Sequence, residues 1–254
     1  SWNVNSIKAR LNTVIEVLNA IDCDVICLQE LKCETDAFPY MEIEDLGYSV
    51  EAHGQKTYNG VAILSKTPIE DVVRGLPGNE DDEQARYIEV TTGGDTPFRV
   101  SSIYLPNGNP FPGEKFDYKL NWMNHLQARA KELLSWEMPV VLAGDYNVIP
   151  GDEDCWDPKA WKDDALAQPE SRAAFQRLQW LGYTECFAAM ENRSHSYTFW
   201  DYQKGAWQKD HGIRIDHLLA SAEAADRLQQ VEIYKKARGL EKPSDHVPII
   251  GLFD

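Results

Sequence analysis

The chain has 254 residues, 43% of them hydrophobic and 26% charged, with 8 Trp, 11 Tyr and 8 Phe, a composition that excludes a disordered protein. No apolar run approaches the ~18 residues that span a membrane, and no secretory leader opens the chain, so we expect a cytoplasmic protein without membrane contact. The 41 acidic and 25 basic residues give a net charge of −16, which argues against nonspecific coating of nucleic acid but allows a local basic rim. Five cysteines without regular pairing indicate reduced thiols.

Hydrophobic periodicity predicts helices and strands that alternate along the chain. Ser6 is the predicted cap of a first helix, in which apolar residues from Ile7 to Ile21 recur at helical spacing. Two further helices are predicted at about 114–136 and 170–181. Short apolar runs predict strands at 24–30, 60–65, 99–104, 140–143, 215–221, 231–234 and 247–253.

Several of these strands follow one another without room for a crossover helix, which implies antiparallel or mixed sheets. The predicted fold is therefore α/β: a four-layer sandwich in which two mixed, mainly antiparallel β-sheets pack face to face with helices outside. No repeat and no linker rich in Pro, Gly or Ser divides the chain, so residues 1–254 are predicted to form one domain.

Acidic and amide side chains stand at the ends of several predicted strands. They are Glu30, Asp145, Asn147, Asp216 and the Asp245-His246 pair. Ends of antiparallel neighbours lie at the same sheet edge, so these groups are expected to converge on one rim. Carboxylates gathered in this way repel one another unless one stays protonated or a cation joins them, and all-oxygen ligands favour Mg²⁺ or Mn²⁺. Such an ion suits phosphoryl chemistry. The alternative for each residue alone is a turn or strand-end position without function.

Six motifs occur in order from the first residue to the last: WNVNSIKARL at 2–11, LQE at 28–30, YLPNG at 104–108, GDYN at 144–147, RID at 214–216 and SDHVP at 244–248. Together they resemble the endonuclease/exonuclease/phosphatase superfamily and, within it, the exodeoxyribonuclease III branch of abasic-site endonucleases. That family has further strand residues before the Trp-Asn motif, so we expect the first strand to be truncated at the N-terminus.

The resemblance implies a set of metal ligands. Glu30 is the implied principal ligand of Mg²⁺ or Mn²⁺, helped by Asn3 or Asn5 and by Asp245. The alternative for the two asparagines is that they only bind backbone at a strand end.

The resemblance also implies the catalytic roles. Asp145 handles the proton of the attacking water, and Asn147 holds that water and the phosphate oxygens. Asp216 orients His246, whose imidazole contacts the scissile phosphate, and Tyr104 contacts the same phosphate. No covalent intermediate is expected. The alternative for Tyr104 is simple packing in the core.

An apolar cluster formed by Phe199, Trp200, Ile213 and Ile215 lies directly before Asp216 in the sequence. Aromatic clusters commonly belong to the core, but in the resembling family this region forms a slot for a sugar that lacks its base. Basic residues near the motifs are candidate phosphate contacts, with solvated surface as the alternative. They are Lys8, Arg10, Lys32, Lys56, Lys115, Lys119, Lys204 and Arg214.

The function implied is a Mg²⁺- or Mn²⁺-dependent DNA phosphodiesterase of base excision repair. We expect a monomer that cleaves duplex DNA 5′ to abasic sites and acts at 3′ ends as an exonuclease and a 3′-phosphodiesterase. Two alternatives stay open. One is another phosphoesterase of the superfamily, acting on an inositol phosphate, a phospholipid or RNA. The other is a non-catalytic binding module with the same fold.

Overall fold

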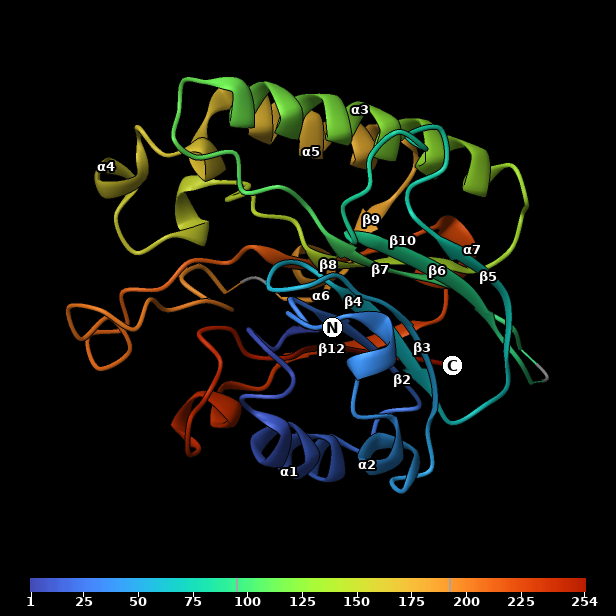
Figure 1. The fold of residues 1–254 in the computed structure, drawn as a ribbon. Coiled ribbons are helices and arrows are strands. Elements are labelled where there is room, and N and C mark those ends of the chain that lie inside the picture. The colour runs from blue at the N-terminus through green and yellow to red at the C-terminus, as the bar shows by residue number, and fades with distance from the viewer. Residues whose placement is uncertain (95, 192) are drawn as a thin grey trace.

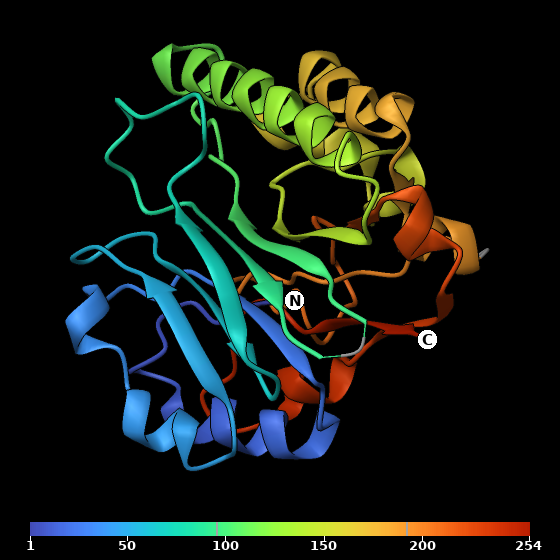
Figure 2. The same ribbon diagram turned by 90° about the vertical axis from the view of Figure 1, so that its right-hand side faces the viewer.

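Two β-sheets pack face to face in the centre of the molecule, and helices cover the outer side of each sheet (Figure 1). The computed structural model describes residues 1–94, 96–191 and 193–254. Seen after a quarter turn in Figure 2, the layers follow one another as helix, sheet, sheet and helix. The predicted four-layer α/β sandwich is confirmed.

The larger sheet has six strands in the order β5-β6-β7-β8-β10-β9. In chain order they are β5 (Ile69–Arg74), β6 (Tyr87–Thr92), β7 (Arg99–Tyr104), β8 (Val140–Asp145), β9 (Thr184–Glu185) and β10 (Asp216–Ala220). The β7–β8 pair runs parallel and the other described pairs of this sheet run antiparallel.

The smaller sheet has the order β1-β2-β4-β3. Its strands are β1 (Trp2–Asn3), β2 (Val25–Gln29), β3 (Ser49–His53) and β4 (Val61–Ser65). A hairpin of β11 (Leu228–Ile233) and β12 (Ile249–Phe253) lies along β1, because Ser1 and Ile249 exchange two backbone hydrogen bonds of 2.8 and 3.0 Å. The β1–β2 pair is parallel and the others are antiparallel, so both sheets are mixed and mainly antiparallel, as predicted.

Helices α1 (Leu11–Ile21) and α2 (Tyr40–Glu44) cover the smaller sheet, and α3 (Glu114–Leu134) and α5 (Pro169–Leu181) cover the larger one (Figure 1). Short helices α4 (Pro158–Trp161), α6 (Cys186–Met190) and α7 (Ala222–Ala225) and four 3₁₀ turns lie in the connections. The 3₁₀ turns are Thr35–Ala37, Asp152–Asp154, Ala165–Ala167 and Lys235–Gly239. Within the described residues, no helix combines the length and the apolar character needed to cross a membrane.

Strand β8 lies between two of the hydrophobic cores formed by the described residues. Val140 and Leu142 pack in the core beneath α3 and α5, whereas Val141 and Ala143 pack in the core between the sheets. Because side chains alternate along a strand and both faces of β8 are covered, this strand is apolar without interruption. That continuous run explains why the sequence predicts β8 clearly.

Most predicted elements are confirmed with small changes at their ends, but the predicted start of the first helix is wrong. Helix α1 begins at Leu11, because Asn5 and Ser6 adopt positive φ angles of 45° and 87° that no helix accommodates. The Ser6 hydroxyl accepts a hydrogen bond from the Ala9 amide in the turn before the helix instead.

Strands β3, β5, β6 and the two-residue β9 were not predicted from the sequence. Strands β3 and β5 are only partly buried, so polar residues interrupt their apolar pattern. Strand β6 is buried but carries Glu89, whose carboxylate pairs with the guanidinium groups of Arg99 and Arg129 in the core. A buried charge that is neutralised in this way cannot be distinguished from an exposed one by hydrophobic pattern.

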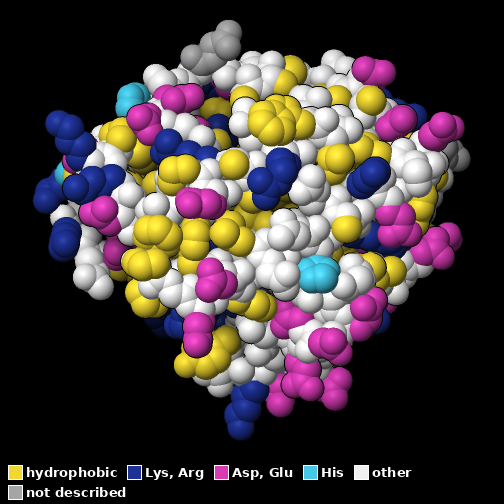
Figure 3. Space-filling model, turned by 90° about the horizontal axis from the view of Figure 1, so that it is seen from above, with side chains coloured by type: hydrophobic (Ala, Val, Ile, Leu, Met, Phe, Trp, Pro, Cys, Tyr) yellow, Lys and Arg dark blue, Asp and Glu magenta, His cyan; other side chains and the backbone are white. Residues whose placement is uncertain are grey.

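The outer face formed by α3 and α5 carries side chains of both charges (Figure 3). Acidic side chains gather at the lower right of this view, and Lys and Arg side chains gather at its left edge. On this face, acidic and basic side chains therefore gather in different places, although the chain as a whole has a net charge of −16. Such a distribution is compatible with a local basic rim on an acidic protein.

Gly144 allows β7 and β8 to approach each other directly before Asp145. A Cβ atom at this position would lie 2.1 Å from the carbonyl oxygen of Ile103 on β7, a distance that no side chain tolerates. Gly144 therefore allows the close spacing of β7 and β8 at the end of the sheet where Tyr104 and Asp145 lie.

We predict that Gly144→Ala lowers the free energy of unfolding by roughly 1–3 kcal/mol or more, because the added methyl group forces two paired backbones apart. Urea denaturation measures the change. Gly239→Ala is the matched control, since a Cβ there meets nothing within 4 Å and should change stability by less than about 0.5 kcal/mol. Equal stability of the two variants would contradict the role of Gly144.

Candidate active site

Three side chains are placed next to one another by the register of the larger sheet. Asp145, the last residue of β8, pairs with Asp216 at the start of β10 and with Tyr104 at the end of β7. Directly paired residues project to the same side of a sheet. The three predicted catalytic residues therefore meet at one edge, and all three come from elements that the sequence predicted.

The smaller sheet contributes Asn3 from β1 and Glu30 from the residue after β2 to the same edge. The Asn3 side-chain amide donates hydrogen bonds of 3.0 Å to Glu30 Oε1 and of 3.0 Å to Asp145 Oδ2. Asn3 thus joins two acidic groups that belong to different sheets. Asn3 Oδ1 also accepts a hydrogen bond of 3.0 Å from the Asn5 backbone amide, so its side chain binds both backbone and the site carboxylates.

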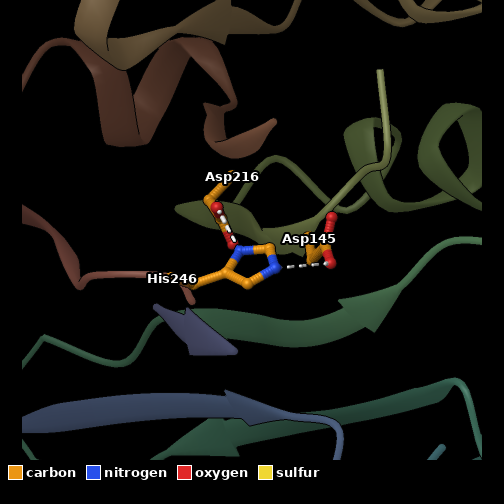
Figure 4. A group of neighbouring side chains, drawn as sticks. All are labelled: Asp145, Asp216 and His246. Atoms are coloured by element: carbon orange, nitrogen blue, oxygen red, sulfur yellow. Dashed lines mark hydrogen bonds and ion pairs between the residues drawn. The ribbon is translucent and has the colours of Figure 1, made fainter. Parts of the chain in front are cut away.

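His246 lies between the two aspartates of the larger sheet, as Figure 4 shows. Its Nδ1 is 2.8 Å from Asp216 Oδ2, and its Nε2 is 3.8 Å from Asp145 Oδ2. Burial disfavours the charged imidazole, but the neighbouring Asp216 and Asp145 outweigh that effect and raise the His246 pKa to about 10. At neutral pH the ring is therefore an imidazolium that balances the carboxylates.

The pKa of Asp145 is raised to about 7, because complete burial disfavours the carboxylate and the charge of Asp216 adds to this effect. The His246 imidazolium and hydrogen bonds from Asn3 and Asn147 act in the opposite direction. The Asn147 backbone amide donates to Asp145 Oδ1 at 2.9 Å. Asp145 is thus a fixed carboxylate whose pKa suits proton transfer near neutral pH.

The side chain of Asn147 is held from two directions. Its Nδ2 donates to the Leu105 carbonyl at 2.9 Å, and its Oδ1 accepts from Asn107 Nδ2 at 3.2 Å. Asn107 belongs to the YLPNG motif but was not assigned a role from the sequence. The Asn107-Gly108 pair of this motif could have marked the residue, but an Asn-Gly pair is equally typical of a turn without function.

Tyr104 lies against the carboxylates. Burial, together with the charges of Glu30 and Asp145, raises the pKa of its phenol far above the ordinary value. The Arg86 guanidinium lies 5.0 Å from the centre of its ring and donates to the Tyr104 carbonyl at 3.2 Å. Tyr104 is therefore a neutral donor at the site, and Arg86 is a neighbour that no sequence motif marked.

The implied metal ligands form a second group of oxygen atoms. Lys32 Nζ lies 2.8 Å from Glu30 Oε2 and 2.5 Å from Asn5 Oδ1, while Asn5 Nδ2 donates to Asp245 Oδ1 at 3.1 Å. Burial disfavours the charged form of Glu30, but Asn3 and Lys32 outweigh it and lower its pKa. The ammonium of Lys32 thus occupies the place of a cation between two oxygens. These carboxylate and amide oxygens fit a hard divalent ion.

Asp145, Asp216 and His246 also offer ligand atoms that lie within 4.8 Å of one another. In this group the imidazolium already faces both carboxylates. The Glu30 group, with oxygen atoms alone, is the better fit for Mg²⁺ or Mn²⁺.

Several site residues adopt backbone conformations that are rare outside glycine. Glu30 has φ +52°, Asn147 φ +47° and Asn5 φ +45°. Such strained residues persist where surrounding contacts fix them, and they concentrate at functional sites. The strain turns these side chains out of the strand direction and toward the shared edge.

The predicted sugar slot divides into surface and core residues. Phe199 pairs through its backbone with both His246 and Ile213, and its ring packs edge-on against the imidazole with centroids 5.0 Å apart. Phe199 is partly exposed, whereas Ile213 and Ile215 are buried beneath it. The contact with His246 places Phe199 at the site, with the two isoleucines as its support.

Two predicted substrate contacts do not fit the structure. Trp200 is fully buried, and its indole donates to Oδ1 of the exposed Asp210 at 3.0 Å. Arg214 is also buried, with ion pairs of 2.7 Å to Asp154 and 3.0 Å to Glu185. Neither side chain is free to contact DNA. For Trp200 the alternative interpretation, a place in the core, holds, whereas the solvated surface expected as the alternative for Arg214 is also wrong, because its guanidinium is buried in ion pairs.

The two predicted basic contacts near the N-terminus differ from each other. Lys8 is exposed. Arg10 is partly buried, donates to the Pro243 carbonyl at 3.0 Å and to the Tyr202 hydroxyl at 2.9 Å, and also bonds to the Asn5 carbonyl. Arg10 therefore fastens the segment that carries Asn5 to the segment before Asp245.

Comparisons with known proteins agree over nearly the whole chain. Residues 1–246 match the Endonuclease/Exonuclease/phosphatase family. Exodeoxyribonuclease III of Haemophilus influenzae is 34% identical over an alignment of 260 residues, which covers 98% of this chain and 97% of that protein.

Two solved structures are also similar. The 3′ phosphatase NExo from Neisseria, bound to a product DNA hairpin, has a TM-score of 0.96 and 38% identity, with 100% of this chain and 97% of that chain covered. An AP endonuclease from Archaeoglobus fulgidus has a TM-score of 0.94 and 35% identity, with 99% and 97% covered.

We predict that His246 stays protonated across the neutral range in the metal-free protein and that Asp216→Asn lowers its pKa by roughly 1–3 units. Because the folded pKa of about 10 lies above the ordinary 6.5, this pair stabilises the fold fully below pH 6.5 and loses its effect as pH rises through 10. The variant should therefore lose more stability at pH 6 than at pH 10.

Nitrogen-detected NMR of the imidazole and urea denaturation at both pH values measure these effects. Asp152→Asn is the control, since this exposed carboxylate pairs only with Arg172 on the surface. A wild-type His246 that titrates near pH 6.5 would contradict the assignment.

Proposed function

The chain belongs to the endonuclease/exonuclease/phosphatase family, and on that premise we propose that it is a metal-dependent nuclease of DNA repair. The observation that carries the proposal is the convergence of acidic, amide and imidazole groups from distant segments on one edge of two packed sheets. These groups are Asn3, Glu30, Asp145, Asn147, Asp216 and His246. The names of the similar proteins, an exodeoxyribonuclease, a 3′ phosphatase bound to DNA and an AP endonuclease, support DNA as the substrate.

In the proposed reaction, Asp145 accepts the proton of the water that attacks phosphorus. Its carboxylate is buried, and the Asn147 backbone amide and the Asn3 amide fix both oxygens in place. A general base held in this way contributes most when its pKa lies near the working pH. The Asn147 side chain, held by Leu105 and Asn107, orients the water and the phosphate oxygens.

His246 stabilises the negative charge that develops on the phosphate. Asp216 holds its Nδ1, so Nε2 faces the edge where Asp145 lies. A buried, preoriented imidazolium is an effective partner for an oxyanion because it needs no reorganisation during the reaction. Tyr104, kept neutral by its surroundings, donates a hydrogen bond to the same phosphate. No residue of this set forms a covalent intermediate, and the 3′-oxygen leaves.

A divalent ion, Mg²⁺ or Mn²⁺, would be held by Glu30 and Asp245 with an oxygen of Asn5 or Asn3. When bound, such an ion neutralises charge on the phosphate and acidifies bound water. The Lys32 ammonium, which lies between Glu30 and Asn5, would give way to the ion.

The substrates we propose are duplex DNA with abasic sites and duplex DNA with 3′ ends. Phe199, supported by Ile213 and Ile215, packs against His246 and offers an apolar wall for a sugar without its base. Exposed Lys8 is a candidate contact to the DNA backbone. A monomeric state and a cytoplasmic location stay predictions from the sequence.

Two functional alternatives have distinct outcomes in one assay. A phosphoesterase for inositol phosphates, phospholipids or RNA would hydrolyse a soluble phosphate monoester or RNA in preference to DNA. A non-catalytic module would bind DNA without cleaving it.

The test uses three duplexes: one with an internal abasic-site analogue, one with a 3′-phosphate end and one intact with a 3′-hydroxyl end. We expect cleavage with Mg²⁺, none with EDTA, and a rate for Asp145→Asn that is lower by roughly 10²- to 10⁴-fold with DNA affinity largely kept. The ratio of the first two rates decides between abasic-site and 3′-end activity. Absence of metal-dependent cleavage from all three would refute the proposal.

A separate prediction concerns the metal ligand. Glu30→Gln should raise the Mg²⁺ concentration needed for half-maximal cleavage by at least about tenfold, because a neutral amide binds a divalent ion more weakly than a carboxylate. A Mg²⁺ titration of the cleavage rate measures this. Glu34→Gln, at an exposed position four residues away, is the control. An unchanged titration would move the metal ligand elsewhere.

A further inference from the structure

A lysine is completely buried in helix α3. Lys119 has 0% of its surface exposed and occupies an inward position of the helix, whereas the neighbouring Leu120 is only partly buried. Lys119 is one of the basic residues expected from the sequence to contact phosphate, and its complete burial rules out that role. A packing role alone does not explain it either, because burying an ammonium group costs stability that an apolar side chain would not lose.

The ammonium of Lys119 binds two backbone carbonyls next to the site. It donates to the Asn147 carbonyl at 2.5 Å and to the Asn107 carbonyl at 3.1 Å. The side chains of these two asparagines are themselves hydrogen-bonded, at 3.2 Å. Lys119 thus joins, from beneath, the two loops whose asparagines face the catalytic edge.

The loop that contains Asn107 and Gly108 packs closely against the Lys119 side chain. Gly108 has φ +90°, and a Cβ atom there would lie 2.7 Å from Lys119 Cδ and 3.2 Å from the Ala165 side chain. The aliphatic stem of the lysine therefore packs directly against the turn after Asn107. Both parts of Lys119, the stem and the ammonium, fix the position of this loop.

The charged groups that face Lys119 are Asp145, at the end of β8, and Asp164, before the 3₁₀ turn at Ala165–Ala167. Burial lowers the Lys119 pKa to about 7, although both carboxylates act in the opposite direction. The ammonium is therefore present below neutral pH and lost above it.

We propose that Lys119 is a positioning residue of the nuclease: its ammonium holds the Asn107 and Asn147 carbonyls and thereby sets Asn147 and Asp145 against the reacting phosphate. The inference rests on the proposed function. In this role, Lys119 does not touch the substrate and acts through the backbone carbonyls of the loops that carry Asn107 and Asn147. A displacement of that loop by about 1 Å is enough to lower the rate of an enzyme roughly 100-fold.

The first test compares Lys119→Met with Arg129→Met on the abasic-site duplex. Methionine keeps the length of the stem but removes the ammonium. Arg129 is the matched control, because it is buried on the same helix but binds the carboxylates of Glu89 and Glu132 and not the carbonyls of Asn107 and Asn147, so its loss is expected to affect stability rather than the catalytic loops. We expect kcat to fall about 10- to 100-fold for Lys119→Met with KM within about threefold, and both constants to stay near wild type for Arg129→Met.

The second test uses Lys119→Arg, which keeps a charge at all accessible pH values. The wild-type rate should fall above neutral pH as Lys119 loses its proton, whereas the arginine variant should keep its rate to higher pH. A purely structural lysine would leave the alkaline limb of the pH profile unchanged. This comparison remains decisive if Lys119→Met does not fold.

The outcomes separate this inference from the proposed function. If the wild-type protein does not cleave DNA with Mg²⁺, the proposed function fails and the role of Lys119 fails with it. If the wild type cleaves but Lys119→Met keeps its kcat, or Lys119→Arg keeps the wild-type alkaline limb, the inference about Lys119 alone is overturned.

Discussion

Carboxylates that are buried side by side repel one another, and the catalytic edge of this molecule is arranged around that constraint. Asp145 and Asp216 meet because the β8–β10 register pairs them directly, and neither can be moved without shifting the sheet. The His246 imidazolium lies between them, and the Asn3 amide connects Asp145 to Glu30 in the other sheet. Each neutralising group comes from a different segment, so the fold must be complete before the charges are balanced.

The sequence allowed the prediction of the elements that place these carboxylates. Strand β8 is apolar on both faces, and the polar residues that end it stand out against that run. Its neighbours β7 and β10 are buried along almost their whole length and were also predicted as strands, so the common edge of Tyr104, Asp145 and Asp216 follows from their parallel and antiparallel pairing with β8. The assignment of roles depended instead on the resemblance to a known family.

Other parts could not be predicted because they depend on tertiary contacts. The bridges that join Phe199 to His246 and Ile213 involve single residues in irregular segments, which leave no periodic pattern. Trp200 follows Phe199 and Arg214 opens the RID motif, yet Trp200 lies in the core and Arg214 forms buried ion pairs with Asp154 and Glu185. A charged residue that is neutralised inside the protein looks in sequence like a charged residue on the surface, and this holds for Glu89 as well.

The uneven distribution of charge has a consequence for the search along DNA. A net charge of −16 repels the polyanion at distances beyond contact, up to the ~8–10 Å over which salt screens such fields. Only short-range attraction by local basic groups opposes it, so intact duplex should release the protein quickly rather than let it slide. Under the proposed function, a lesion or a terminus would add contacts of its own at the catalytic edge. Residence time would then distinguish damaged from undamaged DNA before any bond is broken.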